Sequence, residues 1–346
     1  MRLQLLSLLG LVNSLDTLGA LFREDLVTKQ VKAYYYLWLC NPDDFGTSAC
    51  FGGELADGSR LIVLEHFGRA TRNPPRDVML SYAAKEMGGY GWAFGLHEAL
   101  DQFGALFGPL AAAGIIAWRG DYRLAFTMLL IPALIMLSLL AVARLTYPHP
   151  EKMDSTPPNL EAKGLPRVYW LYLAGAIFVA IGFADFPFMA YHLEKMSIVF
   201  PSMIPVFYAL AMGVSGVGSL LFGRLFDKFG IIILVPLTVL SALFAPLVFF
   251  GGFWAALIGI ALWGLGMGVH ESIIPAAVAM MVPVQRRASA YGLFTAGYGI
   301  FWFLGSVLIG SLYGVSLSLL IAFCLITELA SLPLFFLVGQ QISHKS

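Results

Sequence analysis

Four ionisable residues recur along one face of an apolar segment at residues 61–83. They follow the spacing i, i+4, i+7 and i+11, which places them on one side of an α-helix: Glu65, Arg69, Arg72 and Arg76. Three guanidinium groups cannot face lipid, so this side must point into the protein or water. Guanidinium groups bind carboxylates and phosphates through paired hydrogen bonds, so the face predicts contact with an anion.

A second charged group lies on the segment at residues 92–118, where His97 and Asp101 are spaced i, i+4 and Glu98 adjoins them. If this segment packs antiparallel to 61–83, the residue numbers of two positions at equal depth in the membrane add up to a constant, here called the index sum. Such pairs form either a structural ladder between the helices or a site that handles protons.

The index sums assign partners to the arginines. Arg72 and Asp101 sum to 173, and Arg76 and Glu98 sum to 174. We predict a structural ion pair for Arg76 with Glu98. The same sum places Arg69 opposite Gly104, which offers no carboxylate. We therefore predict that Arg69 contacts a carboxylate or phosphate of the substrate.

Two further acidic positions lie in apolar segments. His270 and Glu271 are adjacent near the middle of 253–283, which predicts either proton coupling or a polar pair hydrogen-bonded to neighbouring helices. Asp185 precedes Pro187 in the segment 168–191. It is a candidate second proton carrier or external gate, although a water-facing carboxylate at a helix end is the favoured interpretation.

Composition requires a lipid environment for the elements that carry these residues. The chain has 346 residues, of which 59% are hydrophobic and 12% charged, and its mean hydropathy is +0.79. Soluble domains carry about 25% charged residues. The formal net charge is zero, which favours no nucleic-acid partner. The cysteines Cys40, Cys50 and Cys324 have no metal-binding spacing.

Nine segments are long and apolar enough to span a bilayer. They are 61–83, 92–118, 124–143, 168–191, 200–222, 231–250, 253–283, 290–313 and 315–338. We therefore predict an all-α polytopic membrane protein with five parts: an atypical 1–60, a partial N-terminal bundle at 61–143, a cytoplasmic linker at 144–167, a six-helix bundle at 168–338 and a tail at 339–346.

The distribution of basic residues predicts the orientation. With the linker in the cytoplasm, ten basic residues fall inside: Lys85, Arg144, Lys152, Lys163, Arg167, Arg224, Lys228, Arg286, Arg287 and Lys345. Three fall outside: Arg119, Arg123 and Lys195. This asymmetry predicts a cytoplasmic C-terminus.

An internal repeat supports the division into two parts. Pro75 is followed by Gly95 and Gly108 at intervals of 20 and 13 residues. Pro275 is followed by Gly292 and Gly305 at intervals of 17 and 13 residues.

Two motifs resemble those of the major facilitator superfamily. The run Gly223-Arg224-Leu225-Phe226-Asp227-Lys228-Phe229-Gly230, at a predicted loop, resembles the family's signature G-x-L-x-D-[RK]-x-G. The run from Gly104 through Gly108 and Pro109 resembles its fifth-helix motif G-x-x-x-G-P, which is associated with antiporters. The resemblance covers residues 61–338 and implies helices four to twelve of a two-bundle transporter.

The resemblance also implies roles for the first motif. Asp227 can cap a helix N-terminus, while Arg224 and Lys228 bind carboxylates or helix C-termini, and together they form a gate at the cytoplasmic face. The alternative is that these basic residues only anchor the topology. Gly53-Glu54-Leu55-Ala56-Asp57 is a weak candidate for the sister copy.

The repeat predicts an incomplete N-terminal half. Residues 22–60 are too polar for lipid, and 3–22 form either one weak span or a leader. Two spans are therefore expected to be missing or scrambled.

The predicted function is secondary active transport of a small solute by alternating access, through proton-coupled efflux or organic-anion transport. The alternatives are a non-functional transporter remnant and, remotely, a membrane-embedded enzyme. A zinc-protease motif H-E-x-x-H fails because Ile274 replaces its second His. We predict a monomer in a prokaryotic inner membrane, with lipid, a small-molecule substrate and protons as partners and with no catalytic residue, metal or cofactor.

Overall fold

The computed structural model describes residues 76–78, 80–84, 86–119, 134, 135, 138, 142 and 164–343. The chain divides into two compact units, of which one contains residues 74–106 and 151–346. Residues 3–73 and 107–150 belong to the other unit, so the N-terminal part of α5 groups with the C-terminal helices. No strand occurs among the described residues.

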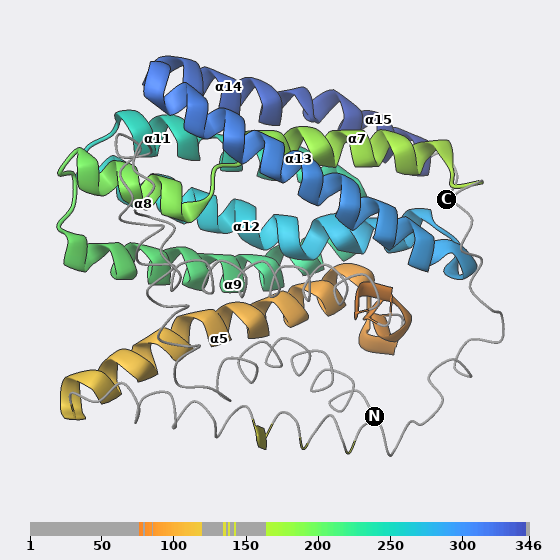
Figure 1. Ribbon diagram of the computed structural model, residues 1–346. Helices are drawn as coiled ribbons and strands as arrows, with labels where there is room; N and C mark the ends of the chain where they lie inside the picture. The colour runs from red at the N-terminus through yellow and green to blue at the C-terminus, as the bar shows by residue number, and fades with distance from the viewer. Residues whose placement is uncertain are drawn as a thin grey trace, which may run out of the picture. The chain divides into compact units, whose positions relative to one another are not determined.

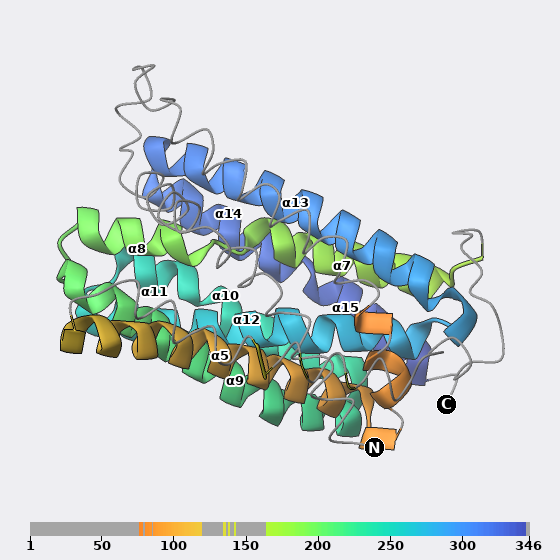
Figure 2. The same ribbon diagram turned by 60° about the horizontal axis from the view of Figure 1, so that its bottom comes forward.

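The main helices are α5 (Tyr90–Arg119), α7 (Arg167–Gly182), α8 (Phe186–Lys195), α9 (Ile204–Phe229), α10 (Leu234–Ala242), α11 (Phe244–Phe250), α12 (Phe253–Met281), α13 (Arg287–Val315), α14 (Leu317–Ala330) and α15 (Leu332–Ser343). Short 3-10 turns occupy Pro201–Met203, Gly230–Ile233 and Val284–Arg286. Figure 1 labels these helices except α10, which is labelled in Figure 2.

Five helical stretches of the described chain are long and apolar enough to cross a bilayer. They are Arg167–Lys195, Ile204–Phe250, Phe253–Met281, Val284–Val315 and Leu317–Ile342. The second has 47 residues, which at 1.5 Å per residue is roughly 70 Å, more than two hydrocarbon cores. Its 3-10 turn at Gly230–Ile233 separates α9 from α10, and the division of this stretch into two of the six spans expected after the linker stays a prediction.

The loop signature lies on a helix rather than in a loop. The span expected to end at residue 222 continues as α9 to Phe229, and Gly230 ends it with φ +69°. No residue from Gly223 to Phe229 opposes helical geometry, whereas a left-handed glycine is the usual C-terminal stop. The signature therefore forms the last two turns of α9.

Glycine contacts set how the helices pack. A Cβ added to Gly264 or Gly268 on α12 would overlap α9 at the backbone of Ala211 and Ser215, respectively, so these helices run parallel. A Cβ at Gly91 or Gly95 on α5 would overlap Gly223 and Ser219 of α9, in antiparallel order. Figure 2 shows α9 and α12 side by side. Small residues permit such close helix approach in membranes.

The first span of the C-terminal bundle is broken in its middle. Helix α7 ends at Gly182, residues 183–185 are not helical, and α8 starts at Phe186. Pro187 lies in the first turn of α8, where its missing N–H is harmless. The indole of Trp263 donates a 2.7 Å hydrogen bond to the Ala184 carbonyl, which satisfies one backbone acceptor of the break.

We expect Trp263→Phe to weaken this break. The substitution leaves a buried carbonyl without its donor, which costs about 1–3 kcal/mol. Thermal unfolding of the purified protein in detergent measures the loss. Trp254→Phe is the control, since Trp254 is 74% exposed, and an equal loss in both variants would contradict the role of the Trp263 hydrogen bond.

Candidate functional site

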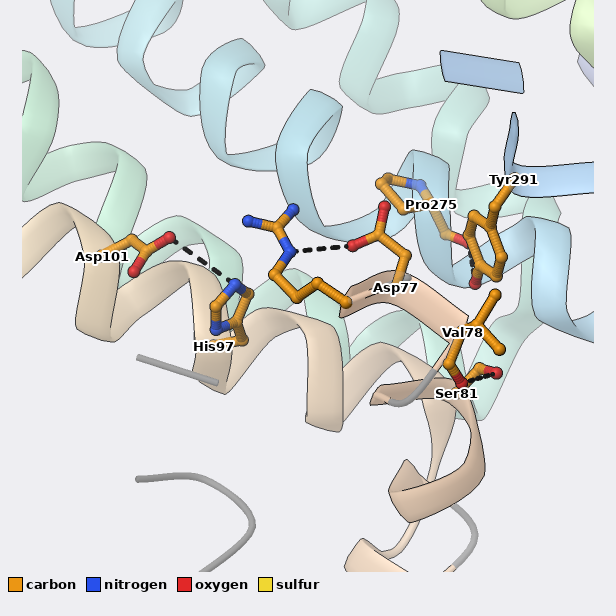
Figure 3. A network of polar contacts seen from close by, with 8 residues as sticks. Asp77, Val78, Ser81, His97, Asp101, Pro275 and Tyr291 are labelled. Atoms are coloured by element: carbon orange, nitrogen blue, oxygen red, sulfur yellow. Dashed lines mark hydrogen bonds and ion pairs between the residues drawn. The ribbon is translucent and has the colours of Figure 1, made fainter. Parts of the chain in front are cut away.

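An ion pair lies where the segment preceding α5 meets α12. Arg76 donates a 3.0 Å hydrogen bond from its Nε to Asp77, whose side chain is buried. Figure 3 shows Asp77 near Pro275 of α12, with His97 and Asp101 of α5 on the other side of the ion pair. Asp101 and Glu271 also attract the Arg76 guanidinium. Arg76 therefore neutralises only part of the negative charge around it.

A pair of carboxyl groups joins α5 to α12. Glu98 is 2% exposed and accepts a hydrogen bond from the side chain of Gln102. The Glu271 carboxyl group of α12 is close enough to act electrostatically on that of Glu98. A carboxyl group donates to another carboxyl group only when one of the two is protonated. A proton on either group would therefore replace their repulsion by a hydrogen bond.

The remaining members of this acidic cluster are His97 and Asp101. The Nε2 atom of His97 lies 3.6 Å from Asp101. Asp101 also acts on Glu98, and Glu271 acts on Asp77. The cluster thus holds four carboxyl groups, one guanidinium group and one imidazole group, namely those of Asp77, Glu98, Asp101, Glu271, Arg76 and His97. Its excess of carboxyl groups favours proton binding.

Although His270 and Glu271 are adjacent, the helix turns their side chains in different directions. Glu271 is exposed and faces the acidic cluster. His270 is buried, and its ring centre lies 4.2 Å from that of Phe183 and 5.9 Å from that of Trp302. His270 therefore belongs to the interior of the C-terminal bundle.

Asp185 lies in the broken span. It accepts hydrogen bonds from the indole of Trp302 at 2.8 Å and from the hydroxyl of Ser306 at 2.7 Å. Both donors come from α13, and Asp185 is partly buried. It is the N-cap residue of α8 and ties the α7–α8 break to α13, whereas its role as a water-facing carboxylate, a proton carrier or a gate stays a prediction.

The end of α9 holds the start of α5. The two carboxylate oxygens of Asp227 accept hydrogen bonds of 2.7 Å from the backbone N–H groups of Gly91 and Trp92. Gly89 has φ +150°, and a Cβ there would overlap the Asp227 carboxylate. Asp227 thus satisfies free N–H groups at the α5 N-terminus, where the helix dipole also favours a negative charge.

Basic residues surround this contact. The Arg224 guanidinium lies 4.1 Å from the ring centre of Trp92. Arg287, at the start of α13, is 4% exposed and donates hydrogen bonds to Ser81, Tyr90 and the Ala279 carbonyl. The starts of α5 and α13 and the ends of α9 and α12 are therefore held together at one end of this unit.

The motifs and the helical architecture agree with one family. The sequence profile of the Major Facilitator Superfamily matches residues 61–306. The chain belongs to the Major Facilitator Superfamily. It is therefore an integral membrane protein of a transporter family rather than a member of an enzyme family.

Relatives and solved structures agree with this membership. An uncharacterized protein of Mycobacterium tuberculosis is 35% identical over 293 residues, covering 83% of this chain and 71% of the relative. An uncharacterized transporter of the same superfamily from Methanocaldococcus jannaschii is 24% identical over 73% of this chain and 65% of its own length.

Solved transporters share the fold at low identity. The E. coli fucose:proton symporter has a TM-score of 0.60 and 12% identity, covering 98% of this chain and 97% of the symporter. A bacterial homologue of the iron transporter ferroportin, in its outward-facing state, has a TM-score of 0.59 and 13% identity, covering 98% and 84%.

The structure contradicts one of the side-chain contacts expected from the sequence and leaves others untested. The predicted pair of Arg76 with Glu98 is wrong, because Arg76 pairs with the adjacent Asp77 and Glu98 contacts Gln102. Arg69 and Arg72 lie outside the described residues. No described residue lies within 4 Å of a Cβ added to Gly104 or Gly108, so close packing at the fifth-helix motif stays a prediction, as does the role of Pro109.

Sequence reasoning missed Asp77, Gln102 and a second buried acid, Glu328 on α14. Both acids lie within segments predicted to span the membrane, where an ionisable residue is a functional candidate by default. That rule alone would have selected them. Gln102 carries no such signal, because only its position one turn after Glu98 makes it a partner.

We expect Asp227→Ala to loosen the α5 N-terminus. Losing a capping carboxylate costs about 1 kcal/mol, because two N–H groups lose their acceptor. Hydrogen exchange at Gly91 and Trp92, followed by mass spectrometry, should rise several-fold. Phe229→Ala, at an exposed position of the same helix end, is the control, and unchanged exchange in Asp227→Ala would contradict the cap.

Proposed function

We propose that the chain is a proton-coupled secondary transporter that moves a small solute by alternating access. The observation that carries the proposal is the buried Glu98 of α5 within electrostatic reach of Glu271 of α12. The two helices lie in opposite halves of the predicted repeat. A proton bound between the two carboxyl groups stabilises their contact, and its loss opposes it.

Coulomb's law sets the size of this effect. Two carboxylates about 4 Å apart repel each other by about 1 kcal/mol in water and by about 4 kcal/mol at an effective dielectric constant of about 20. Because Glu271 is exposed, water screens the pair and its repulsion lies toward the lower value. Deprotonation of the pair therefore biases α5 and α12 toward separation.

The proposed substrate is a small organic anion. The support is the predicted guanidinium face formed by Arg69, Arg72 and Arg76, of which Arg76 already lies in the acidic cluster. Proton symport and organic anion transport both occur on this fold, in the fucose:proton symporter and in a human organic anion transporter with a TM-score of 0.52 and 12% identity over 97% of this chain.

The distribution of basic residues and the two motifs extend the proposal to the topology, the gate and the direction of transport. We place the C-terminus and the Asp227 contact at the cytoplasmic face of a prokaryotic inner membrane, and the protein acts as a monomer. Arg224, Asp227 and Lys228, framed by Gly223 and Gly230, hold the cytoplasmic side closed. The fifth-helix motif favours antiport, which would export the anion in exchange for protons.

Proteoliposomes loaded with a pH-sensitive dye test the proposal. A panel of lactate, succinate and benzoate is applied from either side of the membrane. At least one of these anions should drive proton movement about tenfold above protein-free vesicles, and Glu271→Gln should abolish the movement. Glu86→Gln is the control at an exposed acid. Inserted protein that moves neither anion nor proton would favour the transporter remnant.

A further inference from the structure

A second carboxyl group lies deep inside the C-terminal bundle. Glu328 on α14 is fully buried, with 0% of its surface exposed. The Ser241 hydroxyl of α10 is its near polar neighbour. A Cβ added to Gly182, the last residue of α7, would lie 3.1 Å from Glu328 Cγ. Glu328 therefore lies directly behind the break between α7 and α8.

The polar atoms around Glu328 are unusually poor in hydrogen bonds. Both Glu328 carboxyl oxygens, the Ser241 hydroxyl, the Tyr298 hydroxyl and His270 Nδ1 are buried without a hydrogen bond of normal geometry to any described residue. Native proteins leave few such atoms, and a group of them marks internal water or a change of protonation.

The charges that face Glu328 favour its protonated form. From the helices packed on α14, the titratable neighbours are Tyr298 of α13 and, beyond its ring, His270 and Glu271 of α12. Cys324 is the neighbour on α14 itself. Helices α10, α11 and α15 contain no ionisable residue, and on α7 the nearest position is Gly182.

No lysine or arginine of the described bundle acts on Glu328. Burying a carboxylate without a cation costs several kcal/mol. The neutral acid is therefore the stable form of Glu328 in this conformation.

One side chain links Glu328 to the acidic cluster. Tyr298 lies within electrostatic reach of both Glu271 and Glu328, and its hydroxyl has no partner among the described residues. We propose that Glu328 is a second proton-binding site, which exchanges its proton with Glu271 through the Tyr298 hydroxyl. As Tyr298 passes its hydroxyl proton to the Glu271 carboxylate, it accepts the Glu328 proton and stays neutral, with internal water bridging any gap.

This inference extends the proposed proton coupling, but its test requires no substrate. Infrared spectra of the reconstituted wild type are compared with those of Glu328→Gln over a pH series. The wild type should show the carbonyl band of a protonated carboxylic acid that is lost at alkaline pH and is missing in E328Q. A wild type without that band, or with a band that persists at every pH where the protein is folded, would overturn the site.

A second variant tests the route. After a jump to alkaline pH, Tyr298→Phe should lose the Glu328 band at least about tenfold more slowly than the wild type. Tyr191→Phe, on α8, is the control. An equal rate in Y298F would overturn the role of Tyr298. If E328Q does not fold, Cys324→Ser replaces it, because a hydroxyl one turn away should shift the band of Glu328, and an unshifted band would contradict the assignment.

The two proposals fail differently. A transporter that does not depend on Glu98 and Glu271 shows unchanged proton movement in their glutamine variants. A Glu328 that binds no exchangeable proton shows an infrared spectrum that E328Q leaves unchanged, whatever the transport assay shows.

Discussion

Glu98→Gln is expected to keep α5 and α12 together at every pH. In the proposed mechanism, raising the pH removes a proton held between Glu98 and Glu271, and repulsion between the two carboxylates then favours separation of the helices. Glutamine carries no charge and can still accept the Gln102 hydrogen bond. The variant should therefore lose the alkaline-induced separation while retaining the folded structure.

Spin-label distances between α5 and α12 measure this effect. Labels at Leu100→Cys and Met280→Cys, both at exposed positions, are introduced after Cys40 and Cys50 are replaced by serine. The wild-type distance should lengthen as the pH rises, and the distance in Glu98→Gln should stay short. Glu86→Gln is the matched control. Lengthening in Glu98→Gln equal to that of the wild type would contradict the shared proton.

The same variant should slow transport. Helices α5 and α12 that stay together at every pH cannot complete the proposed alternation between open and closed states. Net anion movement driven by a pH gradient should fall at least about tenfold in Glu98→Gln proteoliposomes. Exchange of labelled for unlabelled anion should fall as well, and exchange at the wild-type rate would contradict the proposed role of helix separation.

The span positions could be predicted because lipid imposes a simple length rule. The segment expected at 253–283 is α12 at Phe253–Met281, and the segment expected at 92–118 is α5 at Tyr90–Arg119. In both cases a long apolar run provides the signal. The end of α9 was misplaced by seven residues, because a charged motif resembles a loop while its backbone remains helical.

Side-chain partners were harder to predict than spans. The index-sum rule treats two helices as straight and allows only contacts between them, so it assigned Glu98 to Arg76 and omitted the adjacent Asp77. Likewise, their adjacency in the sequence placed His270 and Glu271 in one candidate site. Successive residues on a helix point about 100° apart, so the two side chains face different neighbours. One faces the acidic cluster and the other faces Phe183.

The broken span shows a limit of a different kind. Pro187 indicates an interruption near Asp185, but the Trp302 and Ser306 donors come from a helix more than one hundred positions later. No local pattern encodes that distance. The pairing is a product of tertiary packing, in which the break exposes a carboxylate that α13 then satisfies.

Gly223→Leu should have the largest conformational effect of any change at the end of α9. A side chain at this position would overlap the Gly91 carbonyl oxygen, so α5 and α9 could no longer approach closely enough for Asp227 to reach the α5 N-terminus. The substitution removes the closed arrangement without removing any charged group. The protein should fold and insert with this end open.

Alkylation of a cysteine introduced at Trp92 measures the opening, in the same background without Cys40 and Cys50. Modification should rise at least about tenfold in Gly223→Leu. Gly213→Leu makes the same substitution on the same helix, where no described residue lies within 4 Å of an added Cβ, and should leave the rate near that of the wild type. Because glycine at both 223 and 91 permits the contact, Gly91→Leu should reproduce the opening. If the cysteine at position 92 stays protected from alkylation in both Gly223→Leu and Gly91→Leu, the α5–α9 contact does not close this end.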